Sequence, residues 1–124
     1  MTTQGLNVLL VDDNSMNRRI FTVLLKSMGS MVEEASSGEA CLERIKDKKY
    51  DIIFMDHMMP GLDGVETFQK MQEMEESLNK DTPVIALSAD SAEEAANFFR
   101  TAGFNGYLEK PVLQPLLEKM IMEL

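Results

Sequence analysis

Three aspartates occupy two short motifs that could hold a metal ion. Asp12 and Asp13 are adjacent, and Asp56 follows the apolar run IIFM. Two like charges about 4 Å apart repel by roughly 4 kcal/mol at an effective dielectric of 20, so converging carboxylates need a compensating cation. A hard divalent ion held by one or two carboxylates and several waters is the usual form of a Mg²⁺ site. These residues therefore predict Mg²⁺ binding.

Two further side chains suit a phosphoryl group. Lys110 offers a flexible point charge and Ser88 a hydroxyl donor, and both fit phosphate oxygens. A carboxylate can also act as the nucleophile of phosphoryl transfer and form an aspartyl phosphate. Asp56 is the candidate nucleophile, because it ends the central predicted strand and would face both the acidic pair and Lys110.

The elements that position these residues alternate along the chain. Short apolar runs that stop at polar residues predict buried strands, and apolar residues at helical spacing predict helices between them. The predicted strands are 6–11, 30–35, 51–55, 83–87 and 105–108, and the predicted helices are 15–28, 36–45, 63–74, 91–102 and 112–122. Five strands alternating with five helices predict an α/β fold, a doubly wound parallel sheet with helices on both faces.

Local signals mark several helix ends. Ser36 with Glu39, and Asp63 with Glu66, have the spacing of a capping box. Gly29 stands where a left-handed C-terminal cap would fall. In a doubly wound sheet, ligands bind outside the carboxyl ends of the strands, where the strand order reverses. The candidate residues listed above all follow strand ends.

Composition restricts the remaining choices. A length of 124 residues with 44% hydrophobic and 27% charged residues predicts one domain, residues 1–124. The net charge of −9 opposes direct binding to nucleic acid or an anionic membrane. Cys41 is the single cysteine and suits a reducing, cytoplasmic setting. No apolar run approaches the roughly 20 residues of a membrane span, and no signal peptide is recognisable.

The ordered motifs resemble those of response-regulator receiver domains of two-component signalling, which have a flavodoxin-like fold. The resemblance covers the whole chain, through VDDN, MDHMMPGLDG, ALSAD and YLEKP. It implies that Asp56 accepts a phosphoryl group from a histidine kinase. It also implies that Asp13, Asp56 and the backbone carbonyl of Met58 bind Mg²⁺, with Asp12 assisting through water.

The same resemblance assigns roles to the other motifs. Ser88 and Lys110 would contact the phosphoryl oxygens, and the Lys110–Pro111 bond is favoured as cis. Tyr107 is similar to an aromatic switch residue that turns inward when Ser88 moves toward the phosphate, so the surface formed by the fourth helix and the last strand and helix changes its partners. Met58 and Asp90 occupy positions that tune the lifetime of the phosphorylated state.

The segment VDDNSMNRR, with Asn14 and Asn17, is similar to receivers of hybrid histidine kinases. The expected partner is a histidine kinase or a histidine phosphotransfer domain, and the domain would catalyse only its own phosphorylation and dephosphorylation. The chain could be a single-domain regulator or a fragment of a larger protein, and its oligomeric state stays open.

Taken singly, several of these residues have structural interpretations. Asp12 and Asp13 could begin a helix, and Asp56 or Ser88 could be a cap. His57, the single histidine, is expected to be a solvent-facing loop residue, and Cys41 to pack on the second helix. Most of the 11 methionines have helical core spacing, which disfavours a methionine-lined binding surface.

Three other functions remain as alternatives. A flavin or nucleotide carrier would normally have a Gly-rich or Ser/Thr-rich loop after the first strand, where this chain has DDNS. A phosphatase-like hydrolase would turn over phosphoesters continuously with Mg²⁺. A pseudo-receiver that binds partners without phosphorylation would lack one or more site residues, whereas all five are present.

Overall fold

A computed structural model describes residues 5–89 and 93–123 of the chain. The strands are β1 (Asn7–Val11), β2 (Met31–Ala35), β3 (Ile52–Asp56), β4 (Val84–Ser88) and β5 (Gly106–Glu109). The helices are α1 (Ser15–Ser27), α2 (Gly38–Asp47), α3 (Gly64–Glu73), α4 (Glu93–Ala102) and α5 (Gln114–Met122). All ten predicted elements are present. The predicted helix start at Ser91 and the residue Asp90 lie outside the described residues.

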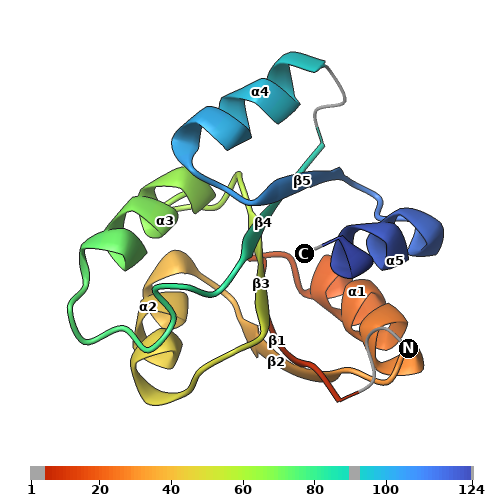
Figure 1. Cartoon of the computed structure of the whole chain (residues 1–124), viewed down its shortest axis with the longest axis horizontal. Coiled ribbons are helices and arrows are strands. Elements are labelled where there is room, and N and C mark those ends of the chain that lie inside the picture. The colour runs from red at the N-terminus through yellow and green to blue at the C-terminus, as the bar shows by residue number, and fades with distance from the viewer. Residues whose placement is uncertain (1–4, 90–92, 124) are drawn as a thin grey trace.

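The five strands form one parallel sheet in the order β2-β1-β3-β4-β5. The chain starts in β1, adds β2 on one side and then crosses to β3 on the other, so the strand order reverses between β1 and β3. Helices α1 and α5 lie on one side of the sheet and α2 and α3 on the other, with α4 beside β5 (Figure 1). The predicted doubly wound α/β fold is confirmed.

Each sheet face has its own apolar core, because consecutive strand residues point to opposite faces. On the α1 and α5 side, Phe21 and Leu25 pack with Leu117 and Ile121 against the strands. The other core contains residues of α2, α3 and α4, and includes the buried Cys41 on α2, as predicted. The three central strands β1, β3 and β4 are therefore covered on both faces.

Helix starts follow local chemistry, with one correction. The Asp63 and Glu66 capping box of α3 is confirmed, with both reciprocal hydrogen bonds formed. The predicted Ser36–Glu39 box is wrong: Ser37 is the N-cap of α2, and its hydroxyl accepts from the Ala40 N–H at 3.0 Å. The N-cap lies one residue later than predicted, and Gly38 packs so closely on α3 that a Cβ there would clash with the Thr67 side chain.

Other local predictions have mixed outcomes. Gly29 has a positive φ of 91°, and the Lys110–Pro111 peptide bond is cis. Six of the ten methionines among the described residues are buried or partly buried, as expected for most of them, whereas Met16, Met31, Met58 and Met122 are largely exposed. Helical spacing does not predict the exposure of a residue at the border of the apolar face of a helix. It also does not apply to a residue on an edge strand or in a loop. Among the described residues, no helix is long and apolar enough to cross a bilayer.

Candidate functional site

The acidic residues meet at the carboxyl edge of the sheet. Asp12 directly follows β1, Asp56 ends β3, and the pairing of Val11 with Met55 brings the two strand ends side by side. Carboxylate oxygens of Asp12, Asp13 and Asp56 all lie within 4.8 Å of one another. Asp12 and Asp56 are buried, whereas Asp13 is exposed at the mouth of the cluster. The predicted convergence of the three carboxylates is therefore found.

Lys110 is the cation of this cluster. Its Nζ lies 2.6 Å from Asp56 Oδ1 and 3.9 Å from Asp12 Oδ2. The lysine reaches the acids because its backbone N–H donates to the Ser88 carbonyl oxygen at 2.7 Å, which continues the β4–β5 ladder beyond its last pair. Among the described residues, Lys110 is the one cation paired with these three carboxylates, which leaves the site electronegative.

Burial dominates the electrostatics of Asp56. The pKa of Asp56 is raised to about 6, and the largest cause is removal of the carboxylate from water. The negative charges of Asp12 and Asp13 contribute to the rise, whereas the hydrogen bond and the charge of Lys110 oppose it. The site therefore holds a carboxylate whose charged form is insufficiently compensated by the protein alone. An added cation would relieve that deficit.

The other predicted residues surround this centre. Ser88 ends β4 and is buried, one position after Leu87, the sheet partner of Asp56. Met58 lies in the loop after β3, with its side chain 72% exposed. Tyr107 lies on β5, and its ring stacks on Phe99 of α4 with centroids 5.5 Å apart. Its hydroxyl oxygen is buried, so the ring already points inward in this structure, whereas the resemblance implied an inward turn only when Ser88 moves toward a phosphate.

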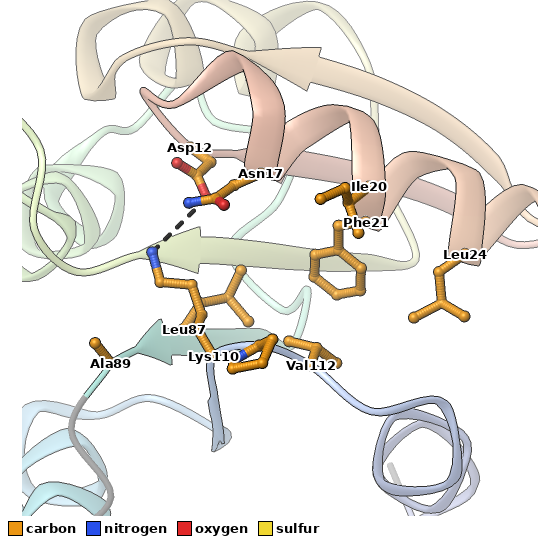
Figure 2. A pocket seen from close by; sticks show the side chains of 10 residues that line it. Asp12, Asn17, Ile20, Phe21, Leu24, Leu87, Ala89, Lys110 and Val112 are labelled. Atoms are coloured by element: carbon orange, nitrogen blue, oxygen red, sulfur yellow. Dashed lines mark ion pairs between the residues drawn. The ribbon is translucent and has the colours of Figure 1, made fainter.

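An apolar groove of about 420 Å³ adjoins the acidic cluster. Figure 2 shows the groove between α1, which contributes Ile20 and Leu24, and the chain after β5, which contributes Lys110 and Val112. Asp12 and Lys110 lie at one end of it, joined by their ion pair. A molecule seated along α1 would thus have one end beside the carboxylates.

His57 does not have the predicted solvent-facing position. Its ring packs edge-on against Phe99, with centroids 5.0 Å apart, and lies 5.7 Å from the Phe98 ring. Its Nδ1 is buried and has no hydrogen-bond partner among the described residues. The loop after β3 folds against α4, a packing that a single sequence position cannot indicate.

Sequence reasoning also missed Arg18. Its Nη1 donates to the backbone carbonyl of Asp12 at 2.7 Å, and its Nε pairs with Glu34 of β2 at 3.0 Å. One signal was available: Arg18 lies near the N-terminus of α1, where the helix dipole disfavours a cation. The predicted helix start at Ser15 is confirmed, and the α1 N-cap is Asn14, which accepts from the Asn17 N–H. Asp12 and Asp13 precede the helix.

A strand-end cluster of three carboxylates and one lysine, on a sheet of this order, defines a class of α/β signalling domain. The family model "Response regulator receiver domain" matches residues 8–122. The chain belongs to the response regulator receiver domain family, and the resemblance stated from the motifs is confirmed.

Individual relatives agree with this assignment. The chain is 35% identical over 120 residues to the autoinducer 2 sensor kinase/phosphatase LuxQ of Vibrio parahaemolyticus, covering 97% of this chain but only 14% of the length of that kinase. The receiver domain of the histidine kinase CKI1 from Arabidopsis thaliana, complexed with Mg²⁺ and BeF₃⁻, is 35% identical, with a TM-score of 0.83 over 98% of this chain and 90% of that one.

A third similarity involves a complex. One chain of the co-crystal structure of the Saccharomyces cerevisiae histidine phosphotransfer protein Ypd1 and the receiver domain of its downstream response regulator Ssk1 is 27% identical to this chain. The TM-score is 0.87, over 99% of this chain and 90% of that one. The similar proteins thus include receivers of a histidine kinase and of a separate response regulator.

Proposed function

We propose that this chain is a phosphoacceptor whose Asp56 takes a phosphoryl group from a phosphohistidine. The observation that carries the proposal is the buried Asp56 carboxylate held at 2.6 Å by Lys110 inside a cluster of acids. Attack by the carboxylate oxygen forms the new O–P bond while the P–N bond to the donor histidine breaks. Water attack on the aspartyl phosphate later releases inorganic phosphate, so the domain catalyses only its own phosphorylation and dephosphorylation.

The residues present fit a Mg²⁺ ion. Three carboxylate oxygens within 4.8 Å form a hard-donor set, and the raised pKa of Asp56 marks an uncompensated negative charge. We assign Asp13, Asp56 and the Met58 backbone carbonyl as direct ligands, with Asp12 acting through water. When bound, the ion would neutralise charge that accumulates on the phosphoryl oxygens during transfer. The CKI1 relative crystallised with Mg²⁺ supports this assignment.

In this proposal Lys110 and Ser88 hold the modified residue. Lys110 leaves its ion pair with Asp56 to contact a phosphoryl oxygen, and the Ser88 hydroxyl donates to another. Ser88 adjoins β5 through the ladder, so its movement changes the space available to the inward Tyr107 ring and to α4. Phosphorylation would thereby shift the equilibrium between two arrangements of the α4, β5 and α5 surface.

A histidine kinase or histidine phosphotransfer domain is the proposed donor, and its helix would lie on the apolar groove. Exposed Met16, Ile20 and Val23 of α1 extend the groove's apolar surface beside the carboxylates. The Ypd1 complex of the Ssk1 receiver supports this class of partner. We further propose that residues 1–124 form one receiver domain and that it acts in the cytoplasm, where ATP supplies the phosphoryl group to such kinases.

Intact mass after incubation with acetyl phosphate tests the phosphoacceptor function. We expect one phosphoryl adduct that requires Mg²⁺ and is absent in Asp56→Ala. Asp51→Ala, at the opposite end of β3, is the matched control and should be modified like the unaltered chain. An unmodified chain in the presence of bound Mg²⁺, or an adduct that persists in Asp56→Ala, would contradict the proposal.

A further inference from the structure

The acidic loop is held by a side chain outside the motifs already described. Arg18 Nη1 donates to the Asp12 carbonyl oxygen at 2.7 Å. That carbonyl belongs to the peptide group joining Asp12 to Asp13, so its hydrogen bond fixes the plane from which the Asp13 side chain projects. The opposite side of Asp12 is fixed by its own N–H, which donates to the Ala35 carbonyl oxygen at 3.1 Å.

Arg18 is in turn fixed by β2. Its Nε donates to Glu34 Oε1 at 3.0 Å, and the second carboxylate oxygen of Glu34 accepts from the Thr22 hydroxyl at 2.8 Å. The Arg18 side chain is 18% exposed, and Thr22 is buried. Thr22, Glu34 and Arg18 thus form a chain of hydrogen bonds that ends on the acidic loop.

Asp13 needs such support more than its neighbours. Asp12 Oδ1 accepts from the Asn14 N–H at 2.9 Å, and Asp56 is paired with Lys110. Within residues 5–89 and 93–123, no hydrogen bond or ion pair holds the exposed Asp13 carboxylate. Its position depends on its backbone, and the orientation of that backbone depends on the Asp12 carbonyl.

We infer that Arg18 is a positioning residue for the metal site: through the Asp12 carbonyl it orients Asp13 for cation binding, and Glu34 and Thr22 orient Arg18. The inference rests on the proposed Mg²⁺ site but not on phosphoryl transfer. The hydrogen bond to the carbonyl outweighs the repulsion between the guanidinium and a bound cation, because Glu34 neutralises much of the arginine's charge.

The direction in which the Mg²⁺ affinity changes shows whether Arg18 acts by orienting Asp13 or only through its positive charge. Loss of a nearby positive charge should strengthen cation binding, whereas loss of a group that orients a ligand should weaken it. Mg²⁺ dissociation constants would be measured by calorimetry for the unaltered chain, Arg18→Ala, Arg18→Lys, Thr22→Val and Arg19→Ala. Arg19 is the matched control, since it carries the same charge on the same helix and is exposed.

We expect Arg18→Ala to weaken Mg²⁺ binding about tenfold, as is typical for loss of a group that orients a metal ligand. Thr22→Val, which leaves all charges in place, should weaken binding less, and Arg19→Ala should leave it unchanged or tighter. Arg18→Lys should not restore the Mg²⁺ affinity fully. A single lysine ammonium cannot reproduce the planar guanidinium, which donates to the Asp12 carbonyl oxygen and to Glu34 Oε1 at once. Circular dichroism would verify that each variant is folded.

Two results would overturn the inference. One is an Arg18→Ala chain that binds Mg²⁺ as tightly as Arg19→Ala, and the other is an unaltered chain that binds no Mg²⁺. Failure of the proposed function is distinguishable, because it would leave the Mg²⁺ affinities in the expected order while no phosphoryl adduct formed on Asp56.

Discussion

At the scale of single residues, Asp56 combines burial with three charged neighbours. The fold forces a carboxylate into a place where its pKa rises to about 6, from about 3.9 in an unfolded chain. Such a site stabilises the folded chain poorly at neutral pH. The negative charge of this buried nucleophile is only partly compensated by the protein, however, so a bound metal ion would stabilise it and phosphorylation would remove the buried carboxylate.

The raised pKa of Asp56 predicts how this residue makes the stability of the chain depend on pH. Between about pH 4 and 6 Asp56 binds more protons in the folded chain than in the unfolded chain, so the contribution of Asp56 to the free energy of unfolding falls as pH rises through this range. Asp56→Asn removes the titration and should be more stable than the unaltered chain at pH 8 in EDTA, by up to about 3 kcal/mol. The gain should vanish near pH 4.

Urea unfolding at pH 4 and pH 8 measures this difference. The exposed Asp47→Asn is the control and should change stability by less than about 0.5 kcal/mol at both pH values. An Asp56→Asn chain that is less stable than the unaltered chain at pH 8 would show that Lys110 compensates the carboxylate fully.

Sequence alone predicted the placement of single residues unevenly. Asp12, Asp13, Asp56, Ser88 and Lys110 were placed correctly at one edge, because strand ends in a parallel sheet share that edge. Arg18 and His57 were not, because their contacts depend on side-chain reach across elements. Arg18 meets Glu34 only through the β1–β2 register, and His57 meets Phe99 only through the placement of α4.

At the scale of elements, β3 and α3 approach so closely that only glycine fits between them. The Gly64 N–H donates to the His57 carbonyl oxygen at 2.7 Å, and a Cβ on Gly64 would clash with the Asp56 carbonyl oxygen and lie 3.0 Å from the His57 Cα. Gly64→Ala should lower the free energy of unfolding by about 1–3 kcal/mol and weaken Mg²⁺ binding, because the Asp56 backbone must move.

Gly38→Ala is the matched comparison for Gly64→Ala. Its Cβ would clash with the side chains of Thr67 and Leu62, between α2 and α3, and not with the backbone of Asp56. We expect a similar loss of stability in urea unfolding but a smaller change in Mg²⁺ affinity. Equal losses of affinity in the two variants would mean that the effect is a general one of packing.

The opposite edge of the sheet is joined by a buried asparagine. Asn79 accepts from the Tyr50 N–H at 2.8 Å and donates to the carbonyl oxygens of Ile45 and Lys48, linking the segments before β3 and β4. Asn79→Ala leaves these buried groups unpaired and should cost about 2–3 kcal/mol in urea unfolding. Mg²⁺ affinity should not change, because Asn79 lies away from the carboxyl edge. The exposed Lys80→Ala should have little effect, and a stable Asn79→Ala chain would contradict this account.

Element order was predictable where element boundaries were not. Apolar runs and helical periodicity identified all ten elements, whereas the α2 N-cap is Ser37 and not Ser36. The Ser36–Glu39 spacing favoured Ser36, but this local signal does not include the close packing of Gly38 on Thr67 of α3.

At the scale of the whole molecule, a net charge of −9 is combined with a local concentration of acids. Any dissolved salt screens the repulsion among the negative charges of the whole chain. Only a cation bound at Asp12, Asp13 and Asp56 compensates the charge of that cluster. Mg²⁺ should therefore raise the melting temperature more than NaCl at matched ionic strength, by the equivalent of about 2.7 kcal/mol at 100 times its dissociation constant.

Thermal unfolding in the two salts checks this specificity. The excess effect of Mg²⁺ should disappear in Asp13→Asn, while the general effect of NaCl remains. Equal stabilisation by Mg²⁺ and NaCl at matched ionic strength would mean that the cluster does not bind the ion selectively.

The phosphoryl group should reside on Asp56, and chemical trapping would identify the modified residue. Borohydride reduces an aspartyl phosphate to homoserine, so the phosphorylated chain would be reduced, digested and sequenced by mass spectrometry. We expect homoserine at position 56, dependent on Mg²⁺ and acetyl phosphate, with Asp12 and Asp13 unchanged. Homoserine at position 12 or 13, or a stable adduct on Ser88 or His57 with Asp56 intact, would contradict it.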